Sequence, residues 1–332
     1  MKRVTSPKAA LLLIGAAMGF ALSADAAGPP PSLALPIACE VGRTCFIQQY
    51  HDHDRGPGAR DYRCGAQTYQ AHDGVDIRLP TLAAQRAGVA VLAAAPGVVR
   101  GVRDGVADVS TRVSGRAAVQ GRECGNGVAV VHAGGWETQY CHMARGSIRV
   151  RQGQTVTAGT PLGNVGLSGD TEFPHVHLAV REDGRAVDPF AYGAAPGACS
   201  GGRNMFDARA QAALAYRAGE VINLGFAGGP VTEPAIDAVA TPPVTRTTPL
   251  VLFARAINLR GGDVQTLTLT GPDGRQILTR ALAPLDRDKA SYFAFAGERP
   301  RSGAWSPGVY RGRYSVTRAG RVVIDRTVEG RL

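Results

Sequence analysis

The density of glycine and proline is the feature that most restricts what this chain can fold into. Its 332 residues include 43 glycines and 21 prolines, and both residue types interrupt helices and mark turns. Hydrophobic residues make up 44% of the chain and charged residues 19%, a composition that supports a buried core and argues against disorder. We therefore expect short strands joined by turns, in about two domains.

Apolar and alternating runs typical of strands are separated by turn residues throughout the chain. Gly134 and Gly135 lie between two of these runs, which predicts a hairpin. The predicted strands are 89–102, 128–132, 137–143 and 174–180, and then 250–259, 264–270, 291–296, 309–317 and 321–328. The sequence thus predicts a mainly β protein, with a compact β-roll-like core and a small C-terminal immunoglobulin-like β-sandwich.

Composition also divides the chain into segments. After residue 26 we expect a Pro-rich tether and Cys-containing segment over 27–69, a core over 70–197, a connecting region over 198–249 and the sandwich over 250–332. The connecting region has one predicted helix, at 206–218, because Ala, Leu, Arg and Gln dominate there and Gly219 follows. A Pro-, Thr- and Gly-rich linker follows it. The last segment has no His and no Cys, so we assign it no chemistry.

The N-terminus has the pattern of a secretory signal peptide. Lys2, Arg3 and Lys8 precede an apolar run from residue 9 to 22, and Ala24-Asp25-Ala26 resembles a cleavage site. The alternative is an uncleaved membrane anchor, although the run is shorter than the roughly 20 residues of a membrane span. With cleavage after Ala26, no transmembrane segment is expected in the remainder. We therefore expect an exported protein, located in the periplasm or cell envelope or secreted.

All six cysteines follow this segment, and an even number in an exported chain favours disulfides. Six cysteines allow 15 pairings, so the sequence alone leaves the connectivity open. As a hypothesis, the first two could close a small loop, the fourth and fifth could meet across a hairpin, and the remaining two would then pair. These pairs are Cys39–Cys45, Cys124–Cys141 and Cys64–Cys199.

Two short motifs supply metal-binding groups. His72 and Asp76 form H-x-x-x-D, and in an extended chain both side chains point to the same face as Gly74, which has no side chain to obstruct an ion. His175 and His177 form H-x-H on one face of a predicted strand. Together they offer two imidazoles and a carboxylate for a metal, with a spare imidazole beside them. Such a set with an open fourth position is typical of catalytic zinc.

A further histidine, His142, lies on the predicted strand 137–143, two residues after Tyr140. Residues two apart on a strand share a face. If this face lines the same cleft, His142 can act on the attacking water or on the substrate.

These residues in this order resemble the lysostaphin-type (LytM-like) zinc endopeptidases, which cut peptidoglycan cross-links. The resemblance covers about residues 70–190 and includes the spacing of Gly153, Val156, Gly159 and Gly163. It implies a core of antiparallel β-sheets, one zinc ion per chain and a peptidoglycan peptide as substrate. It also implies that His72, Asp76 and His177 hold the zinc, and that His142 and His175 are the catalytic pair.

One stretch departs from that pattern. Residues 169–174, Gly-Asp-Thr-Glu-Phe-Pro, stand where the family usually has a small Ser-Thr-Gly-Pro turn before H-x-H. Because that turn borders the substrate groove, its replacement bears on substrate preference.

Other motifs carry less chemistry. His132 precedes the hairpin turn and is expected to be structural. His51 and His53 could form a second metal site, but we expect a solvated loop because Gly56 follows closely and no fourth ligand is evident. The region 46–60 is also a candidate for a latency segment that plugs the groove. The G-x-S-x-G and H-E-x-x-H motifs are absent from the sequence, which argues against a serine nucleophile and a zincin-type base.

The formal net charge of +10 raises the possibility of a polyanionic partner. Arg is spread along the whole chain without basic clusters interleaved with aromatics, so we expect no nucleic-acid binding, and GC-rich coding is an alternative source of the Arg. The remaining alternative to an enzyme is a non-catalytic module of the same fold that binds cell wall and activates another hydrolase. Such modules usually lack ligands, and this chain lacks none. The sequence does not indicate an oligomeric state.

Overall fold

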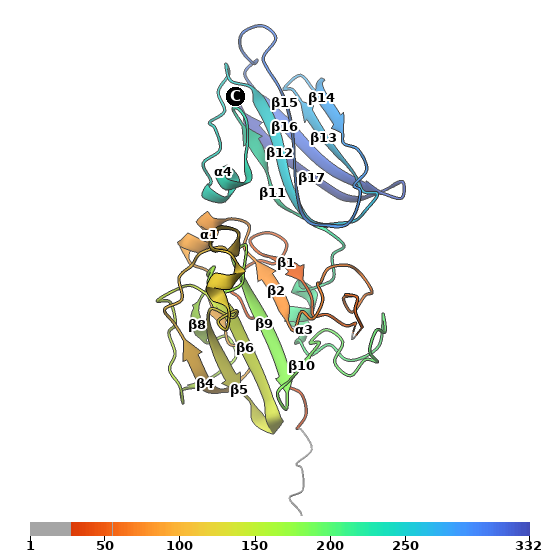
Figure 1. Ribbon diagram of the computed structural model, residues 1–332. Helices are drawn as coiled ribbons and strands as arrows, with labels where there is room; N and C mark the ends of the chain where they lie inside the picture. The colour runs from red at the N-terminus through yellow and green to blue at the C-terminus, as the bar shows by residue number, and fades with distance from the viewer. Residues whose placement is uncertain (1–27, 55) are drawn as a thin grey trace, which may run out of the picture.

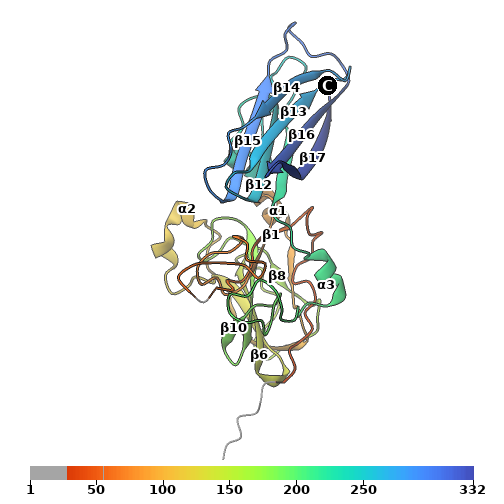
Figure 2. The ribbon, with the colours of Figure 1, turned by 90° about the vertical axis from the view of Figure 1, so that its right-hand side faces the viewer.

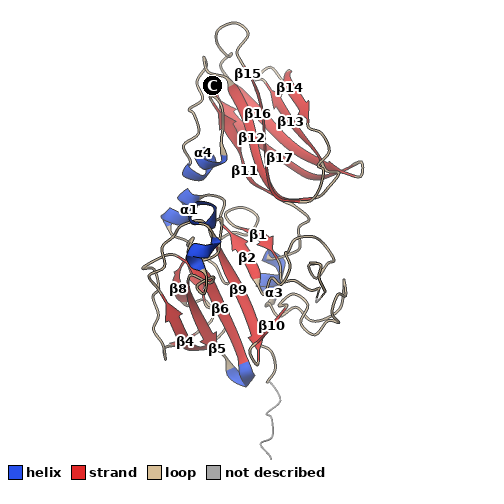
Figure 3. Ribbon diagram, viewed as in Figure 1, coloured by secondary structure: helices blue, strands red, loops and turns tan. Residues whose placement is uncertain are grey.

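The computed structural model describes residues 28–54 and 56–332, and the predicted signal peptide therefore lies outside the described residues. The described chain forms two β-rich units stacked end to end (Figures 1 and 2). Strands dominate both units and the helices are short (Figure 3), which confirms a mainly β protein with antiparallel sheets. No helix within the described ranges is long and apolar enough to cross a membrane.

An eight-stranded antiparallel sheet is the larger of two sheets in the first unit. Its strand order is β1-β2-β9-β6-β5-β4-β7, and β10 pairs with β9 beside this path. The strands are β1 (Phe46–Gln49), β2 (Val75–Arg78), β4 (Gly97–Arg103), β5 (Asn126–Val131), β6 (Trp136–Met143), β7 (Thr155–Val156), β9 (His175–Glu182) and β10 (Arg185–Val187). The predicted strands 128–132, 137–143 and 174–180 are thus confirmed within two residues, as β5, β6 and most of β9.

The predicted single strand over 89–102 is wrong, because it forms two strands in different sheets. β3 (Ala90–Leu92) pairs with β8 (Pro161–Asn164), whereas β4 belongs to the large sheet. Between them, Ala93, Ala94 and Ala95 are fully buried and the chain bends before Pro96. Proline has no N–H to continue a ladder, so the apolar run changes sheets at this point.

The helices are more numerous than the one expected. They are α1 (Leu82–Ala87), α2 (Thr111–Ser114), α3 (Ala208–Ala213) and α4 (Glu233–Ala238), with 3₁₀ turns η1 (Arg116–Val119) and η2 (Ala133–Gly135). The helix predicted at 206–218 is the shorter α3, which begins after its cap Asp207. It ends at Ala213, and beyond it Tyr216 stacks on Tyr50 with ring centroids 5.3 Å apart.

The segment expected as a Pro-rich tether packs against the first unit. Leu33 and Ile37 are 0% and 1% exposed and belong to its hydrophobic core. The backbone is tied down as well, since Leu33 donates to the carbonyl of Met205 and Ala34 to that of Ala94. The sequence pattern did not reveal these buried residues, because the segment is rich in proline and its apolar residues follow neither a strand nor a helix period.

The second unit contains two antiparallel sheets, of three and four strands. Buried side chains from both sheets, including Leu252, Leu267 and Tyr314, form one cluster. Its strands are β11 (Glu220–Ala227), β12 (Leu250–Leu259), β13 (Val264–Thr270), β14 (Gln276–Ala281), β15 (Lys289–Glu298), β16 (Val309–Arg318) and β17 (Arg321–Arg331). β11 was not expected, since it lies in the predicted connecting region, yet it pairs with β12 along its whole length.

A buried contact joins the two units. Phe46 of β1 packs with Ile222 and Ile257 of the second unit. Gln48, 1% exposed, donates to the Ala290 carbonyl at 2.7 Å, and Asn258 donates to the Gln48 carbonyl at 3.0 Å. The segment 46–60 therefore begins as a paired strand that contacts the second unit, and this strand is part of the sheet.

Three disulfides form, with the pairing hypothesised from the sequence: Cys39–Cys45, Cys64–Cys199 and Cys124–Cys141. Cys64 and Cys199 are 135 residues apart in the chain. Their bond ties the N-terminal segment to the stretch that follows β10.

Removing the long-range disulfide should destabilise the protein more than removing the short one. By the chain-entropy model, Cys64→Ser with Cys199→Ser costs about 5 kcal/mol, and Cys39→Ser with Cys45→Ser costs about 2 kcal/mol, because a longer closed loop restricts the unfolded chain more. Urea unfolding of both double variants measures the difference. Equal losses of unfolding free energy would contradict the expectation.

Candidate active site

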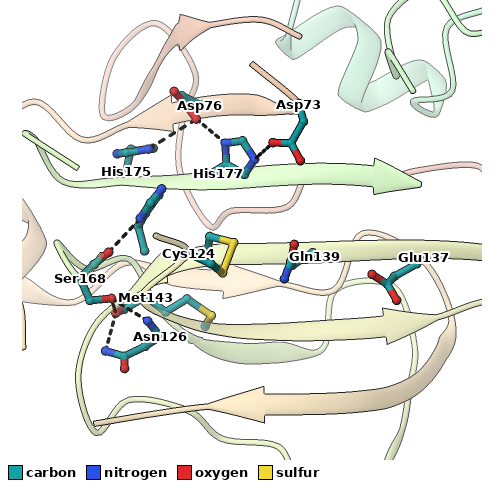
Figure 4. The surroundings of a disulfide bond; sticks show 12 residues. Asp73, Asp76, Cys124, Asn126, Glu137, Gln139, Met143, Ser168, His175 and His177 are labelled. Carbon is teal, nitrogen blue, oxygen red and sulfur yellow. Dashed lines mark hydrogen bonds and ion pairs between the residues drawn. A yellow bond between two sulfur atoms is a disulfide. The ribbon is translucent and has the colours of Figure 1, made fainter. Parts of the chain in front are cut away.

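Three residues predicted as metal ligands meet at one point on the large sheet. Asp76 of β2 lies opposite His177 of β9 in the strand register, and His72 reaches the same point from the preceding turn. All three are buried, and their ligand atoms form a cluster able to hold a metal ion. Figure 4 shows Asp76 and His177 converging.

The ligand atoms have the spacing of one face of a tetrahedron. His72 Nε2 lies 3.2 Å from Asp76 Oδ1 and 3.1 Å from His177 Nδ1, and His177 Nδ1 lies 2.9 Å from Asp76 Oδ1. Zinc bonds of about 2.0 Å to N and O ligands require ligand separations of about 3.3 Å. The donor set therefore fits zinc, and the fourth direction is free of a protein ligand in this described cluster.

Neighbouring groups fix which nitrogen of each imidazole faces the metal site. His72 Nδ1 lies 2.6 Å from the Tyr50 carbonyl oxygen, so Nδ1 is the donor and Nε2 is left as the ligand. His177 Nε2 lies 3.1 Å from Asp73 Oδ1, and Arg181 in turn donates to Asp73 Oδ2 at 2.9 Å. Such outer partners orient ligands and raise their basicity. Asp73 directly follows His72 but lies outside both metal-binding motifs, so the sequence pattern did not reveal its role.

The two carboxylates at the site, those of Asp73 and Asp76, are stabilised by positive charge. Burial raises the pKa of Asp76, but the charges of His72 and His175 outweigh it and hold that pKa well below its usual range. Burial lowers the pKa of His177, but hydrogen bonds to Asp73 and Asp76 overcome this and raise it to about 9. Without a metal, His177 thus carries the positive charge that the two carboxylates require. A divalent metal would supply this charge instead and release the proton.

Backbone geometry brings His72 to the site. The turn before it places Ala71 at φ 61°, and Gly74 follows before β2 begins. A Cβ on Gly74 would lie 2.6 Å from His177 Nε2 and 2.5 Å from the Leu178 carbonyl oxygen. The glycine predicted to leave room for an ion thus leaves room for a ligand ring.

Two further imidazoles lie beside the ligand cluster. The rings of His142 and His175 have centroids 4.5 Å apart, and His175 Nε2 lies 3.4 Å from Asp76 Oδ1. His142 Nδ1 lies 2.8 Å from the Ser168 carbonyl oxygen, and His175 Nδ1 lies 2.9 Å from that of Phe173. Each Nδ1 is therefore a donor, so the Nε2 of His142 is left as an acceptor, whereas the Nε2 of His175 faces the Asp76 carboxylate. Burial, then the charges of His175 and His177, lower the pKa of His142 well below its usual value.

The way His142 reaches the site differs from the expectation. Tyr140 pairs with Leu178 and is fully buried in the core, whereas Cys141 pairs with His177. Regular strand alternation would place the His142 side chain on the core face of the sheet with Tyr140, away from the metal site. A φ of 60° at His142 breaks the alternation, and the neighbouring Cys124–Cys141 disulfide holds the chain there (Figure 4). Such a conformation costs free energy and often marks a functional residue.

The site opens into a cavity of about 750 Å³ that both units line. The unusual turn at residues 169–174 borders it, as the sequence predicts. Within this turn Thr171 Oγ1 lies 3.0 Å from His175 Nδ1, and the Phe173 ring packs on His175 at 4.8 Å. On the opposite side, Glu233, Asp237 and residues 288–291 of the second unit form the wall. The last segment of the sequence has no His and no Cys, so this contribution to the cavity was not expected.

Histidines outside the site have other partners. His132 is structural, as expected, since its nitrogens lie 2.7 Å from the Pro96 carbonyl oxygen and 2.9 Å from Thr138 Oγ1. The solvated-loop interpretation of His53 is wrong: its side chain is 8% exposed and lies 3.4 Å from Asp188 Oδ2. Among the described residues, His51 and His53 belong to no metal-binding cluster.

Two imidazoles and a carboxylate that converge on a β-sheet, with two more imidazoles beside them, are a donor set that fits a catalytic metal site. Residues 70–189 match the model described as peptidase family M23. The chain therefore carries an M23 metallopeptidase domain with a His72, Asp76 and His177 site, which confirms the resemblance to lysostaphin-type enzymes.

Two curated relatives show similarity over part of the chain. The cell division protein DipM of Caulobacter vibrioides is 31% identical over 128 residues, 37% of this chain and 17% of DipM. The DD-carboxypeptidase/endopeptidase Mpg of Neisseria meningitidis is 32% identical over 124 residues, 37% of this chain and 23% of Mpg. The matched part thus spans about a fifth of the length of these relatives.

Solved structures of M23 proteins also align with the chain. The catalytic domain of the prophage-encoded M23 protein EnpA from Enterococcus faecalis, solved as a point mutant, is 26% identical with a TM-score of 0.31, covering 45% of this chain and 92% of that domain. The catalytic domain of lysostaphin from Staphylococcus simulans is 20% identical with a TM-score of 0.27, covering 42% and 85%.

Replacing Asp73 should weaken metal binding without removing a ligand. Asp73→Asn loses the carboxylate that orients His177, so we expect zinc affinity to fall about 10- to 100-fold. Competition with a chromogenic chelator measures this affinity. Asp325→Asn, in the second unit and distant from the site, serves as the control, and an unchanged zinc affinity in Asp73→Asn would contradict the role.

A methyl group at Gly74 should displace His177. Gly74→Ala places a Cβ against the ring and the Leu178 carbonyl, so we expect less than one zinc per chain after dialysis. Gly101→Ala is the matched control, because a Cβ there meets no atom within 4 Å. Zinc content by atomic absorption checks both variants, and full occupancy in Gly74→Ala would refute the steric argument.

Proposed function

We propose that this protein is an exported zinc endopeptidase that hydrolyses peptide bonds in peptidoglycan cross-links. The observation that carries the proposal is the complete ligand triangle of His72, Asp76 and His177, with the imidazoles of His142 and His175 beside it. The M23 match supports the reaction class. A relative named as a DD-carboxypeptidase/endopeptidase supports the substrate class.

In the proposed mechanism His72, Asp76 and His177 hold one zinc ion. When bound, zinc supplies Lewis acidity that polarises the scissile carbonyl and acidifies water to a pKa of about 7. His142 stays neutral because of its burial, and its free Nε2 can take the proton of the attacking water. Protonated His142 or His175 can then donate to the leaving amine, and imidazole N–H groups can stabilise the developing oxyanion.

The surrounding residues keep these imidazoles in position. The Ser168 and Phe173 carbonyls fix the orientation of the two rings, and the Cys124–Cys141 disulfide holds the backbone beside His142. Orientation before the reaction is a major source of enzymatic rate enhancement. The proposed mechanism therefore needs no Glu base.

Location outside the cytoplasm fits the same proposal. Three disulfides, with no free cysteine among the described residues, favour an oxidising compartment. A periplasmic or cell-envelope location would place the enzyme next to its substrate. We also propose that the second unit is an immunoglobulin-like sandwich, whose two sheets share one core, and that it serves as one wall of the substrate cavity.

Single substitutions separate metal binding from chemistry. We expect His177→Ala to lose both zinc and activity. We expect His142→Ala to keep one zinc per chain and to lower turnover about 100-fold or more, since only a proton-transfer group is lost. Release of new amine termini from purified sacculi, with zinc present, measures activity. Normal turnover by His142→Ala would refute its role, and no release by the unmodified protein would refute the proposed function.

A further inference from the structure

Arg78 is a buried cation on the floor of the cavity, next to the metal site. It lies two residues after Asp76 on β2 and opposite His175 on β9, so its side chain projects from the same face of the sheet as Asp76. Arg78 lines the cavity together with Asp76, His142 and His175, and it is only 4% exposed. Two residues along a strand correspond to about 6–7 Å.

Among the basic residues that line the cavity, Arg78 alone has no acidic partner. Four of the five, all within the described chain, form an ion pair: Arg112–Glu172, Arg116–Asp170, Arg255–Asp237 and Lys289–Asp286. By contrast, no carboxylate oxygen of the described residues lies within 4.0 Å of the Arg78 guanidinium. The carboxylates of Asp237 and Glu233 act on Arg78 only from beyond this distance, and a buried charge without a direct ion-pair partner is unfavourable unless a ligand supplies one.

Neutral contacts hold the Arg78 side chain in place. Its Nη1 donates to Gln48 Oε1 at 2.7 Å, its Nε donates to the Leu79 carbonyl oxygen at 3.4 Å, and its guanidinium lies 4.4 Å from the centre of the Phe173 ring. Gln48 is itself fixed by its hydrogen bond to Ala290. The side chain is therefore ordered before any ligand binds, which lowers the entropic cost of binding. Its Nη2 has no protein partner among the described residues and remains available to an anion.

We propose that Arg78 binds a free carboxylate of the substrate peptide, one or two residues from the scissile bond, so that the enzyme selects cross-links carrying such a carboxylate. This inference rests on the proposed endopeptidase function. The spacing supports it, because a substrate whose scissile carbonyl is at the metal site extends over 6–7 Å for about two residues. Arginine suits this task, since its planar guanidinium matches a carboxylate in charge and geometry.

The test compares two forms of one substrate. Cross-linked muropeptide dimers from sacculi are used as isolated and after chemical amidation of their carboxylates. We expect the unmodified enzyme to cleave the carboxylate form with kcat/KM at least about 10-fold higher, since hydrogen bonds to charged groups contribute strongly. Arg78→Gln should bring the two forms within about twofold, chiefly through a higher KM for the carboxylate form. Arg78→Lys should restore part of the preference.

Arg112→Gln is the matched control, because Arg112 lines the same cavity but is already paired with Glu172. It should retain the preference of the unmodified enzyme. The preference is a ratio of rates, so partial unfolding of a variant lowers both rates and leaves the ratio unchanged.

Each outcome decides a separate point. If the unmodified enzyme cleaves both forms equally well, or if Arg78→Gln keeps the full preference, Arg78 does not bind a substrate carboxylate and the inference is wrong. The proposed endopeptidase function is unaffected by that result. If the unmodified, zinc-loaded enzyme cleaves neither form, the proposed function fails first. If Arg78→Gln does not fold, Arg78→Lys and the preference of the unmodified enzyme decide the matter.

Discussion

The pairing of β2 with β9 is the constraint on which the rest of the site depends. This register places Asp76 directly opposite His177 and Arg78 opposite His175. A slip by one residue would turn every one of these side chains to the other face of the sheet. The register is specified by burial, because Val75, Ile77, Val176 and Leu178 alternate with the site residues and are at most 1% exposed. The same alternation that builds the core therefore builds the metal site.

Around this pair of strands, the structure holds each functional group by a contact from elsewhere in the chain. The Tyr50 carbonyl orients His72 and the Asp73 carboxylate orients His177. His142 is held in a left-handed conformation next to a disulfide. These supports come from the residue after β1, from the turn before β2 and from the end of β6. A site whose groups are fixed in advance does not spend binding free energy on ordering them.

The second unit changes the character of the cavity. It contributes acidic side chains, among them Glu233 and Asp237, to the cavity that His142 and His175 also line. Lys289, the first residue of β15, lines the same cavity. Its contact with β1 is apolar at Phe46 and polar at Gln48. Gln48 also accepts from Arg78, so the junction between the units and the proposed carboxylate site share one side chain. The wall and the floor of the cavity are thereby linked.

The sequence by itself determined the strands with clear alternation and the ligands with short spacing. β12 and β13 begin and end where their patterns predict, and H-x-x-x-D with H-x-H located the metal site, since residues close in sequence reveal their common face through the strand period. Only the tertiary structure decided the rest. Distant parts of the chain decide three features: the role of Asp73 beside His177, the left-handed φ of His142, and the lack of an ion-pair partner at Arg78. β11 was hidden in a region of mixed composition, and its partner β12 begins more than 20 residues later. Local periodicity records the face on which a residue lies, whereas its partners are set by long-range pairing that no local pattern encodes.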